Sequence, residues 1–310
     1  MSGEKLKVVF MGTPEFSVPT LKAVANEFDV VAVVTAPDKP RGRGRKLTPT
    51  PVKSAALELG LEVLEPESLK DDEFAGKLKT YNADIFCVVA FRILPEKVFT
   101  IPKIASFNVH TSILPKYRGA APINWAIIKG ETKTGVTSFV LDKDIDTGQV
   151  IGTKELDITP TMTAGELHDA MMPMAAELAV ESCNVLSQPD YELKPQDDSL
   201  ATPAPKIFRE DCEVDFSLGG EELKNFINGM SPIPGAWTEW DGKKVKFLKC
   251  ELFDKKSGNP RHFSIENDNF LLQTSSGSVK VLMIQPAGKK VMKVEDFLAG
   301  YRGNKEGIIE

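Results

Sequence analysis

The stretch KVVFMGTPEFSVPTLKAVANEFDVVAVVTAP, residues 7–37, decides the fold. It opens with a short apolar, β-rich run that ends at Gly12, continues with apolar residues at helical spacing, and closes with a second apolar run. A strand, a helix and a strand in this order form a βαβ unit, whose crossover is right-handed in nearly all proteins. The stretch therefore predicts two parallel strands joined by a helix.

The same alternation continues downstream. The patterns predict helices over 51–60 and 71–82, with strands over 61–66, 83–91 and 104–110. The strand at 83–91 is apolar on both faces, which is typical of a sheet covered on both sides. Further along, the sequence predicts a helix at 120–130, two strands joined by an acidic turn at 134–158, and a long helix capped by Thr163 with Glu166 at its third position. The first part of the chain is thus expected to be an open, doubly wound α/β domain.

The composition changes near residue 189. The segment 189–206 contains four prolines and few large apolar side chains, which is typical of a linker. Beyond it, short β-rich runs alternate with turn signals, as in a small β-barrel or sandwich. We expect a first domain at 1–188, a linker at 189–206 and a second domain at 207–310.

Composition limits the class of protein. The 310 residues carry a net charge of −6, which argues against a general affinity for polyanions. The longest apolar run, residues 85–91, is too short to span a membrane, and the N-terminus lacks the pattern of a signal peptide. The cysteines are widely spaced without a CxxC pair, which favours buried thiols over a zinc site or disulfides: Cys87, Cys183, Cys212 and Cys250. A cytoplasmic protein without membrane contact is expected.

Asn108 and His110 lie at the end of the strand predicted over 104–110. Ligands bind at the carboxyl ends of strands in doubly wound sheets, and a spacing of two residues directs both side chains to one face. An amide donor beside a titratable imidazole suits acyl transfer, because the pair can stabilise an oxyanion and carry a proton. The alternative is a structural histidine that closes the end of a strand.

A partner for the imidazole is expected in DKDIDTGQ, residues 142–149, which supplies Asp142, Asp144 and Asp146. A neighbouring carboxylate favours the imidazolium and orients the ring. The sequence does not select one of the three, and a solvated acidic turn is the alternative.

The segment PDKPRGRGRKLTPTPVK, residues 37–53, concentrates six basic residues in a chain of negative net charge. It predicts a loop that contacts nucleic-acid phosphates, with a merely solvated loop as the alternative. A dinucleotide site is not expected, because GTPEFS after the first strand does not match GxGxxG; nor is there a GxxxxGK[ST] loop.

Four stretches resemble the methionyl-tRNA formyltransferase family: residues 8–24, the basic segment 37–53, FNVHTSILPKYRGAAPINWAI at 107–127, and DKDIDTGQVI at 142–151. The resemblance extends through 203–216 and 227–238, and so covers nearly the whole chain. It implies transfer of a formyl group from 10-formyltetrahydrofolate to methionyl initiator tRNA. We expect that this reaction needs no metal and that the protein is a monomer. The implied fold is a Rossmann-like domain followed by a small C-terminal barrel resembling an OB-fold, which helps to hold the tRNA.

The resemblance also implies roles for individual residues. The family's catalytic Asn, His and Asp match Asn108, His110 and Asp146. The folate-contacting turn matches Ser112, Ile113, Leu114 and Pro115, while Phe91 and Arg92 border the pterin pocket. The basic loop that binds the tRNA acceptor end matches Arg41, Arg43, Arg45 and Lys46.

Two departures from the family pattern bear on these roles. VVAFRILP at 88–95 is one residue shorter than the usual VVAYGLILP and has Arg92 where glycine is expected, and Asn228 stands in place of an arginine. Two other functions remain to be distinguished: a formyltransferase for a small amine, which would need neither the basic loop nor the barrel, and a noncatalytic RNA-binding protein.

Overall fold

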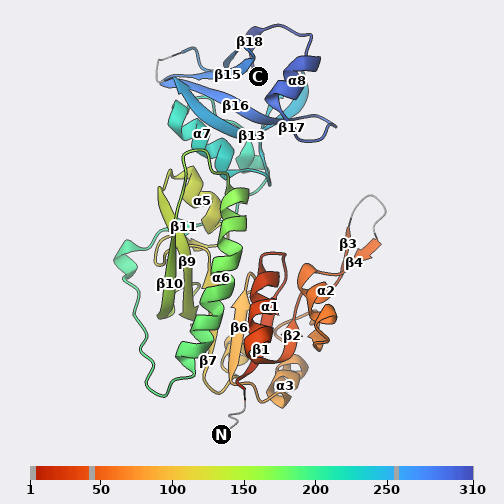
Figure 1. Ribbon diagram of the computed structural model, residues 1–310, viewed down its shortest axis with the longest axis vertical. Helices are drawn as coiled ribbons and strands as arrows, with labels where there is room; N and C mark the ends of the chain where they lie inside the picture. The colour runs from red at the N-terminus through yellow and green to blue at the C-terminus, as the bar shows by residue number, and fades with distance from the viewer. Residues whose placement is uncertain (1–4, 42–45, 255–257, 310) are drawn as a thin grey trace. The chain divides into compact units, whose positions relative to one another are not determined.

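The computed structural model describes residues 5–41, 46–254 and 258–309, without the side chains of Arg41 and Lys46 (Figure 1). The chain divides into two compact units. Unit 1 contains Met1–Gly119, Gly135–Leu156 and Asp169–Pro203, and unit 2 contains Ala120–Thr134, Asp157–His168 and Ala204–Glu310. This division differs from the boundary expected near residue 189, because unit 2 includes two earlier segments. The physical reason lies in packing within unit 2, where α5 (Pro122–Ile128) contacts α7 (Gly220–Gly229).

A seven-stranded sheet organises unit 1, in the order β10-β9-β7-β6-β1-β2-β5. The strands β1 (Lys7–Gly12), β2 (Asp29–Val34), β5 (Val63–Leu64), β6 (Ile85–Val89) and β7 (Ala105–His110) pair in parallel. The helix α1 (Ser17–Glu27) connects β1 to β2 and packs against both, which confirms the expected βαβ unit. The later helices α2 (Pro51–Glu58), α3 (Asp72–Thr80) and α4 (Glu96–Phe99) separate the other parallel strands.

Burial explains why the central strands are continuously apolar. Every residue of β6 is buried, and so are Val8–Gly12 of β1. One core cluster combines side chains of β1, β2 and β6 with Phe74 and Leu78 of α3. A sheet that is buried on both faces keeps a fixed strand register, so the ends of its strands hold their side chains in defined positions.

The strand direction reverses after β7. β9 (Lys133–Val140) runs antiparallel to β7, with Thr137 opposite His110 and Val140 opposite Phe107. β10 (Val150–Asp157) is the edge strand next to β9, as the sequence predicted for this pair. The connection from 141 to 149 therefore begins beside β7 and carries the acidic residues of the DKDIDTGQ stretch.

The basic segment begins and ends in a short antiparallel pair, β3 (Lys39–Arg41) and β4 (Lys46–Thr48). These strands extend away from the seven-stranded sheet (Figure 1). Two contacts close the base of the segment: the hydroxyl groups of Thr35 and Thr50 lie 2.8 Å apart, and Lys53 bonds Asp38 at 2.9 Å.

Unit 2 contains a second, antiparallel sheet in the order β12-β13-β16-β15-β14-β18, with β17 beside β16. Its strands are β12 (Ala236–Trp240), β13 (Lys243–Asp254), β14 (His262–Glu266), β15 (Asn269–Thr274), β16 (Gly277–Pro286), β17 (Met292–Lys293) and β18 (Glu306–Ile308). The sheet curls into a half-barrel around an apolar core, in which the Trp240 ring meets Phe263 edge-on with centroids 5.0 Å apart. The half-barrel confirms the expected small C-terminal β domain. A short helix, α8 (Val294–Gly300), follows β17.

Asn228 is a structural residue in this unit. It is 1% exposed, and its side-chain amide bonds both backbone groups of Cys250, donating to the carbonyl at 3.0 Å and accepting from the N–H at 2.8 Å. These bonds satisfy the backbone N–H and carbonyl groups of Cys250 at a point where the register between β13 and β16 shifts. Asn228, where the resemblance predicted an arginine, thus supports the half-barrel from within.

The long helix α6 (Ala164–Leu186) begins as its capping residues predict, with the backbone N–H of Glu166 donating to the Thr163 hydroxyl at 3.2 Å. The four cysteines are free and buried, as expected. Burial raises the pKa of the Cys183 thiol to about 12. Among the described residues, we find no helix with the length and apolar character needed to cross a membrane.

Candidate active site

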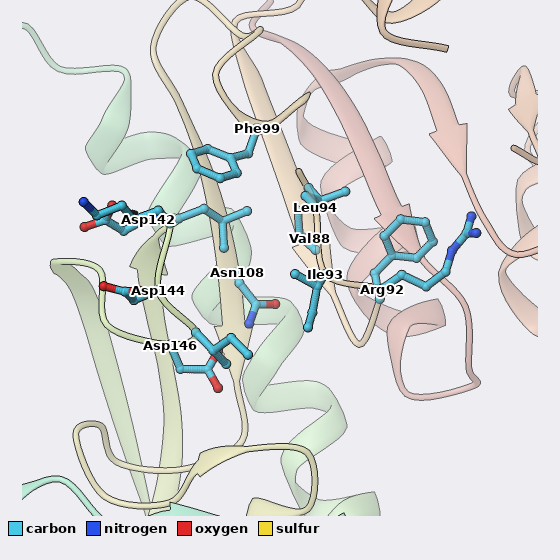
Figure 2. Close-up of a pocket in the computed structure, with 13 residues that line it drawn as sticks. Val88, Arg92, Ile93, Leu94, Phe99, Asn108, Asp142, Asp144 and Asp146 are labelled. Carbon is cyan, nitrogen blue, oxygen red and sulfur yellow. Dashed lines mark hydrogen bonds between the residues drawn. The ribbon is translucent and has the colours of Figure 1, made fainter. Parts of the chain in front are cut away.

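A pocket in unit 1 lies beside β7 and the acidic connection that follows β9 (Figure 2). Asn108 is at its centre, the three aspartates lie along one side, and apolar residues such as Val88, Leu94 and Phe99 form other parts of the wall. The cavity volume is about 120 Å³. Asn108 reaches the pocket because β7 places it opposite Val88, the fourth residue of β6.

His110 is 6% exposed and lies next to this pocket rather than in its lining. Its Nε2 atom is 2.8 Å from the backbone oxygen of Tyr117. A carbonyl oxygen can only accept a hydrogen bond, so Nε2 must carry a hydrogen and donate it. Nδ1 is therefore the ring nitrogen that can take up and release a proton, and it faces Asp146 Oδ2 at 3.7 Å.

Asp146 is the aspartate of the three that approaches His110, while Asp142 and Asp144 line the pocket without an ion pair to the ring. Its backbone has a φ of +58°, a left-handed conformation that aspartate adopts more easily than most residues. Gly148 permits the turn to approach β9, since a Cβ atom there would lie 1.7 Å from the Val140 oxygen. The DTG sequence thus turns the carboxylate back toward β7.

The tripeptide Tyr117–Gly119 contacts both His110 and Asp146. The carbonyl of Tyr117 accepts from His110, and the backbone N–H of Gly119 donates to Asp146 Oδ2 at 2.9 Å. The side chain of Arg118 reaches Gln196, which bonds the backbone of the Asp146 turn. Sequence reasoning did not single out Arg118 or Gln196. No periodic pattern marks a single arginine in a turn, or a single amide in a proline-rich segment.

Arg92 lies on the pocket wall, but its guanidinium points away from Asn108 (Figure 2). It donates to the backbone oxygens of Pro66 at 2.9 Å and Glu67 at 3.2 Å, and it stacks near the ring of Phe91. Burial lowers the pKa of Arg92, and the charge of Glu67 partly offsets this effect. Arg92, where the resemblance predicted a glycine, therefore ties the connection after β6 to the chain after β5.

The turn Ser112–Pro115, expected to contact folate, is not among the residues that line this pocket. Ser112 is fully buried, and its hydroxyl donates to the Lys116 oxygen at 2.6 Å. Thr137 of β9 holds the turn on both sides, accepting from the N–H of Leu114 and donating to the oxygen of Ser112. These hydrogen bonds fix the conformation of the connection between His110 and Tyr117.

The expected tRNA contacts are described only in part. Arg41 and Lys46 are paired across the β3–β4 ladder, with their side chains outside the description. Arg43 and Arg45 lie outside the described residues.

Comparison with known proteins identifies the family. Residues 6–182 match the family described as formyl transferase, and residues 206–302 match the formyl transferase C-terminal domain. The chain belongs to the formyl transferase family. Within it, the chain is 41% identical over 316 residues to a methionyl-tRNA formyltransferase of Parabacteroides distasonis, covering 97% of this chain and 98% of the relative. A methionyl-tRNA formyltransferase of Clostridium novyi is 42% identical, with 98% and 100% covered.

Formyl transferases also share the fold. An N-formyltransferase from Helicobacter canadensis, solved with folinic acid and dTDP-3-aminofucose, superposes with a TM-score of 0.66 at 21% identity, covering 91% of this chain and 99% of that one. At this identity the similarity establishes the fold alone. Within the described residues, no group of three or more His, Cys, Asp or Glu side chains is arranged to hold a metal ion.

Proposed function

We propose that this formyl transferase moves the formyl group of 10-formyltetrahydrofolate to the α-amino group of methionyl initiator tRNA. The observation that carries the proposal is the convergence of Asn108, His110 and Asp146, within a chain about 41% identical over nearly its full length to methionyl-tRNA formyltransferases. Folate as the formyl donor is supported by the folinic acid in the similar Helicobacter canadensis structure.

Asn108 and His110 stabilise the negative charge that develops on the formyl oxygen during the reaction. The bound folate supplies an activated formyl group, whose oxygen gains negative charge as an amine attacks its carbon. The Asn108 amide can donate a hydrogen bond into the pocket, and a protonated His110 adds positive charge beside it. Donors that are held in place before the reaction act without reorganising, which is the main source of their effect.

His110 and Asp146 also serve proton transfer. The attacking amine must lose a proton and the departing folate nitrogen must gain one, so a single proton carrier suffices. Nδ1 of His110 is the ring atom free for this task, because Nε2 is engaged by Tyr117. The carboxylate of Asp146 lies 3.7 Å from this atom and places a negative charge beside it.

The pocket fits part of a folate. Its volume of about 120 Å³ is below the roughly 300–1,000 Å³ that buries a drug-sized ligand, so it suits one ring system. Apolar side chains such as Val88 and Leu94 can cover the faces of a ring, and the polar groups near Asp142 and Asp144 can bond its edge. We assign the pterin ring to this pocket, with Phe91 and Arg92 in its wall and the turn Ser112–Pro115 as a further folate contact.

We assign binding of the tRNA acceptor end to Arg41, Arg43, Arg45 and Lys46, and further tRNA contacts to the C-terminal domain at 207–310. The remaining parts of the proposal are a monomer that acts in the cytoplasm, where aminoacylated tRNA is used, and a reaction that needs no metal.

The test is a formylation assay with purified enzyme and 10-formyltetrahydrofolate. The acceptors are methionyl initiator tRNA, methionyl elongator tRNA, glycinamide ribonucleotide and an amino-sugar nucleotide. We expect formylmethionine on the initiator tRNA, with at least a tenfold lower kcat/KM for the other acceptors. Preferred use of a small amine would reject the tRNA assignment and retain formyl transfer, whereas tRNA binding without any transfer would favour an RNA-binding role.

A further inference from the structure

The side chain of Gln196 bonds the turn that carries Asp146. Its Nε2 atom donates to the backbone oxygen of Asp146 at 2.9 Å and to that of Gly148 at 2.8 Å. An amide nitrogen has two hydrogens, so both donors are used. One side chain, fifty positions away in the sequence, thus holds both ends of the Asp146–Gly148 turn.

Arg118 fixes the orientation of that amide. The Oε1 atom of Gln196 accepts from Nη2 of Arg118 at 2.7 Å and from Nε at 3.2 Å. Because an arginine side chain has only donors, the amide must direct its oxygen to Arg118 and its nitrogen to the turn. Asp198 accepts from the same Nη2 at 2.6 Å, which keeps the guanidinium in place.

These contacts form a closed ring around Asp146. Arg118 directly precedes Gly119, whose N–H bonds the Asp146 carboxylate, while Gln196 bonds the Asp146 backbone. Gly119 therefore fixes the side chain of Asp146, and Arg118 fixes its main chain through Gln196. A left-handed non-glycine residue persists only where its surroundings hold it.

The chain on either side of Gln196 is bonded to unit 1. The backbone groups of Lys194 and Val150 bond each other in both directions, at 2.8 and 2.9 Å. After Gln196, the Thr202 hydroxyl accepts from the N–H of Tyr117, and the Thr202 carbonyl accepts from that of Arg118, both at 2.9 Å. A segment with the composition of a linker is here part of the site's framework, because hydrogen bonds fix it where apolar side chains are few.

We propose that Gln196 is a positioning residue for formyl transfer: it sets the place of the Asp146 carboxylate relative to His110, and Arg118 orients its amide. The inference rests on the proposed function for the role of Asp146 in the reaction.

Two variants test this role. Gln196→Glu keeps the shape and the contact with Arg118, but it replaces the two donors by an acceptor that faces two carbonyl oxygens. Gln196→Ala removes all of these contacts. Ser199→Ala is the matched control, because Ser199 is exposed, lies in the same segment and donates to the Asp197 carboxylate through its N–H and its hydroxyl.

Kinetics provide the first readout. Displacement of a catalytic group by about 1 Å can cost about 10²-fold. We expect both Gln196 variants to lower kcat about 10- to 100-fold, with less than about a twofold change in KM for tRNA and folate, while Ser199→Ala keeps kcat. An unchanged kcat in Gln196→Glu, or a loss confined to KM, would overturn the inference.

The second readout does not use activity. The chain has three histidines, so the ring signals of His110 in an NMR spectrum are identified by their loss in His110→Gln. We expect Gln196→Glu to shift these signals toward their position in Asp146→Asn, and Ser199→Ala to leave them in place. Unshifted His110 signals in Gln196→Glu would overturn the inference. If the wild-type enzyme formylates no amine, the proposed function fails, and the NMR comparison alone decides whether Gln196 positions Asp146.

Discussion

Nδ1 of His110 faces Oδ2 of Asp146 at 3.7 Å, and the opposite ring nitrogen is held by the carbonyl of Tyr117. The separation exceeds hydrogen-bond length, so the pair is an ion pair when the ring is protonated. One nitrogen is thus committed to structure and the other is free to exchange a proton. Neutral His110 is therefore held in the tautomer that carries its hydrogen on Nε2.

Replacement of His110 by Ala should lower kcat for formyl transfer about 10²- to 10⁴-fold, the range for loss of a general acid–base group. Asp146→Asn should lower it through the same step, so the double variant should lose less than the product of the two single losses. Single-turnover rates with methionyl initiator tRNA measure both effects. His262→Gln, in β14 of unit 2, is the control and should keep the single-turnover rate at saturating tRNA. Full activity in His110→Ala would remove the imidazole from the mechanism.

Asn108→Ala should lower kcat about 10²- to 10³-fold, as expected for loss of one donor to an oxyanion. Folate binding should change far less, because the donor acts on charge that develops during the reaction. To separate the effect on catalysis from the effect on binding, the rate of transfer and the equilibrium binding of a nonreactive folate are measured on the same preparation. A loss that appears entirely in folate affinity would assign Asn108 to binding alone.

Arg92→Ala should weaken folate binding, because the wall of the pocket loses its tie to the Pro66 and Glu67 carbonyls. A loss of about 1.5–3 kcal/mol, the scale of one hydrogen bond to a charged group, raises Kd about 10- to 150-fold. The KM for tRNA should stay the same. Arg302→Ala is the matched control, since the Arg302 guanidinium bonds carbonyls of its own neighbourhood, Ala299 and Tyr301. Unaltered folate affinity in Arg92→Ala would show that the wall holds its shape without this residue.

Replacement of Arg41, Arg43 and Arg45 by Ala should raise the KM for tRNA and flatten its dependence on salt. Each lost phosphate contact to a single strand lowers the slope of log K against log salt by about 0.7. Hydrolysis of the formyl donor without tRNA should change little. The exposed lysines Lys22, Lys70 and Lys79, replaced together, provide a control with the same change in charge. Equal slopes in the two triple variants would mean that net charge, not this segment, attracts the tRNA.

Glu166 should stabilise the fold above acidic pH. Burial raises its pKa, but the hydrogen bonds from Lys249 and Thr163 act more strongly and leave the pKa below the ordinary value of 4.5. A carboxylate with a lowered pKa in the folded state contributes stability above its unfolded pKa and loses it as the pH falls. Glu166→Gln should therefore melt at a lower temperature than wild type at pH 7, and the difference should shrink below about pH 4.5.

Thermal unfolding at both pH values measures this effect. Glu295→Gln provides the comparison, because Glu295 also lies in the first turn of a helix, α8, where the cap makes no side-chain hydrogen bond. A difference between Glu166→Gln and wild type that persists at low pH would place the effect outside ionisation.

Periodicity predicted the parallel strands and placed Asn108 and His110 at the end of β7, because buried strands have a simple pattern. It could not choose among the three aspartates by itself. The approach of Asp146 depends on a left-handed turn and on an N–H from Gly119, 27 positions earlier in the chain. Gln196 was missed for the related reason that its partners are backbone groups distant in sequence. Asn228 is buried where the register of the second sheet shifts, and residue type alone does not reveal such a shift.

Tyr117 and Gly119, which hold His110 and Asp146, are separated by one residue. The spacing between proton carrier and carboxylate is thus set by a single peptide unit on each side of Arg118. When the site fluctuates, both groups should be displaced together, so their separation varies less than the position of either one. The His110–Asp146 distance is in this way protected from thermal motion by the short spacing of Tyr117 and Gly119. An insertion of one residue between them would remove that protection.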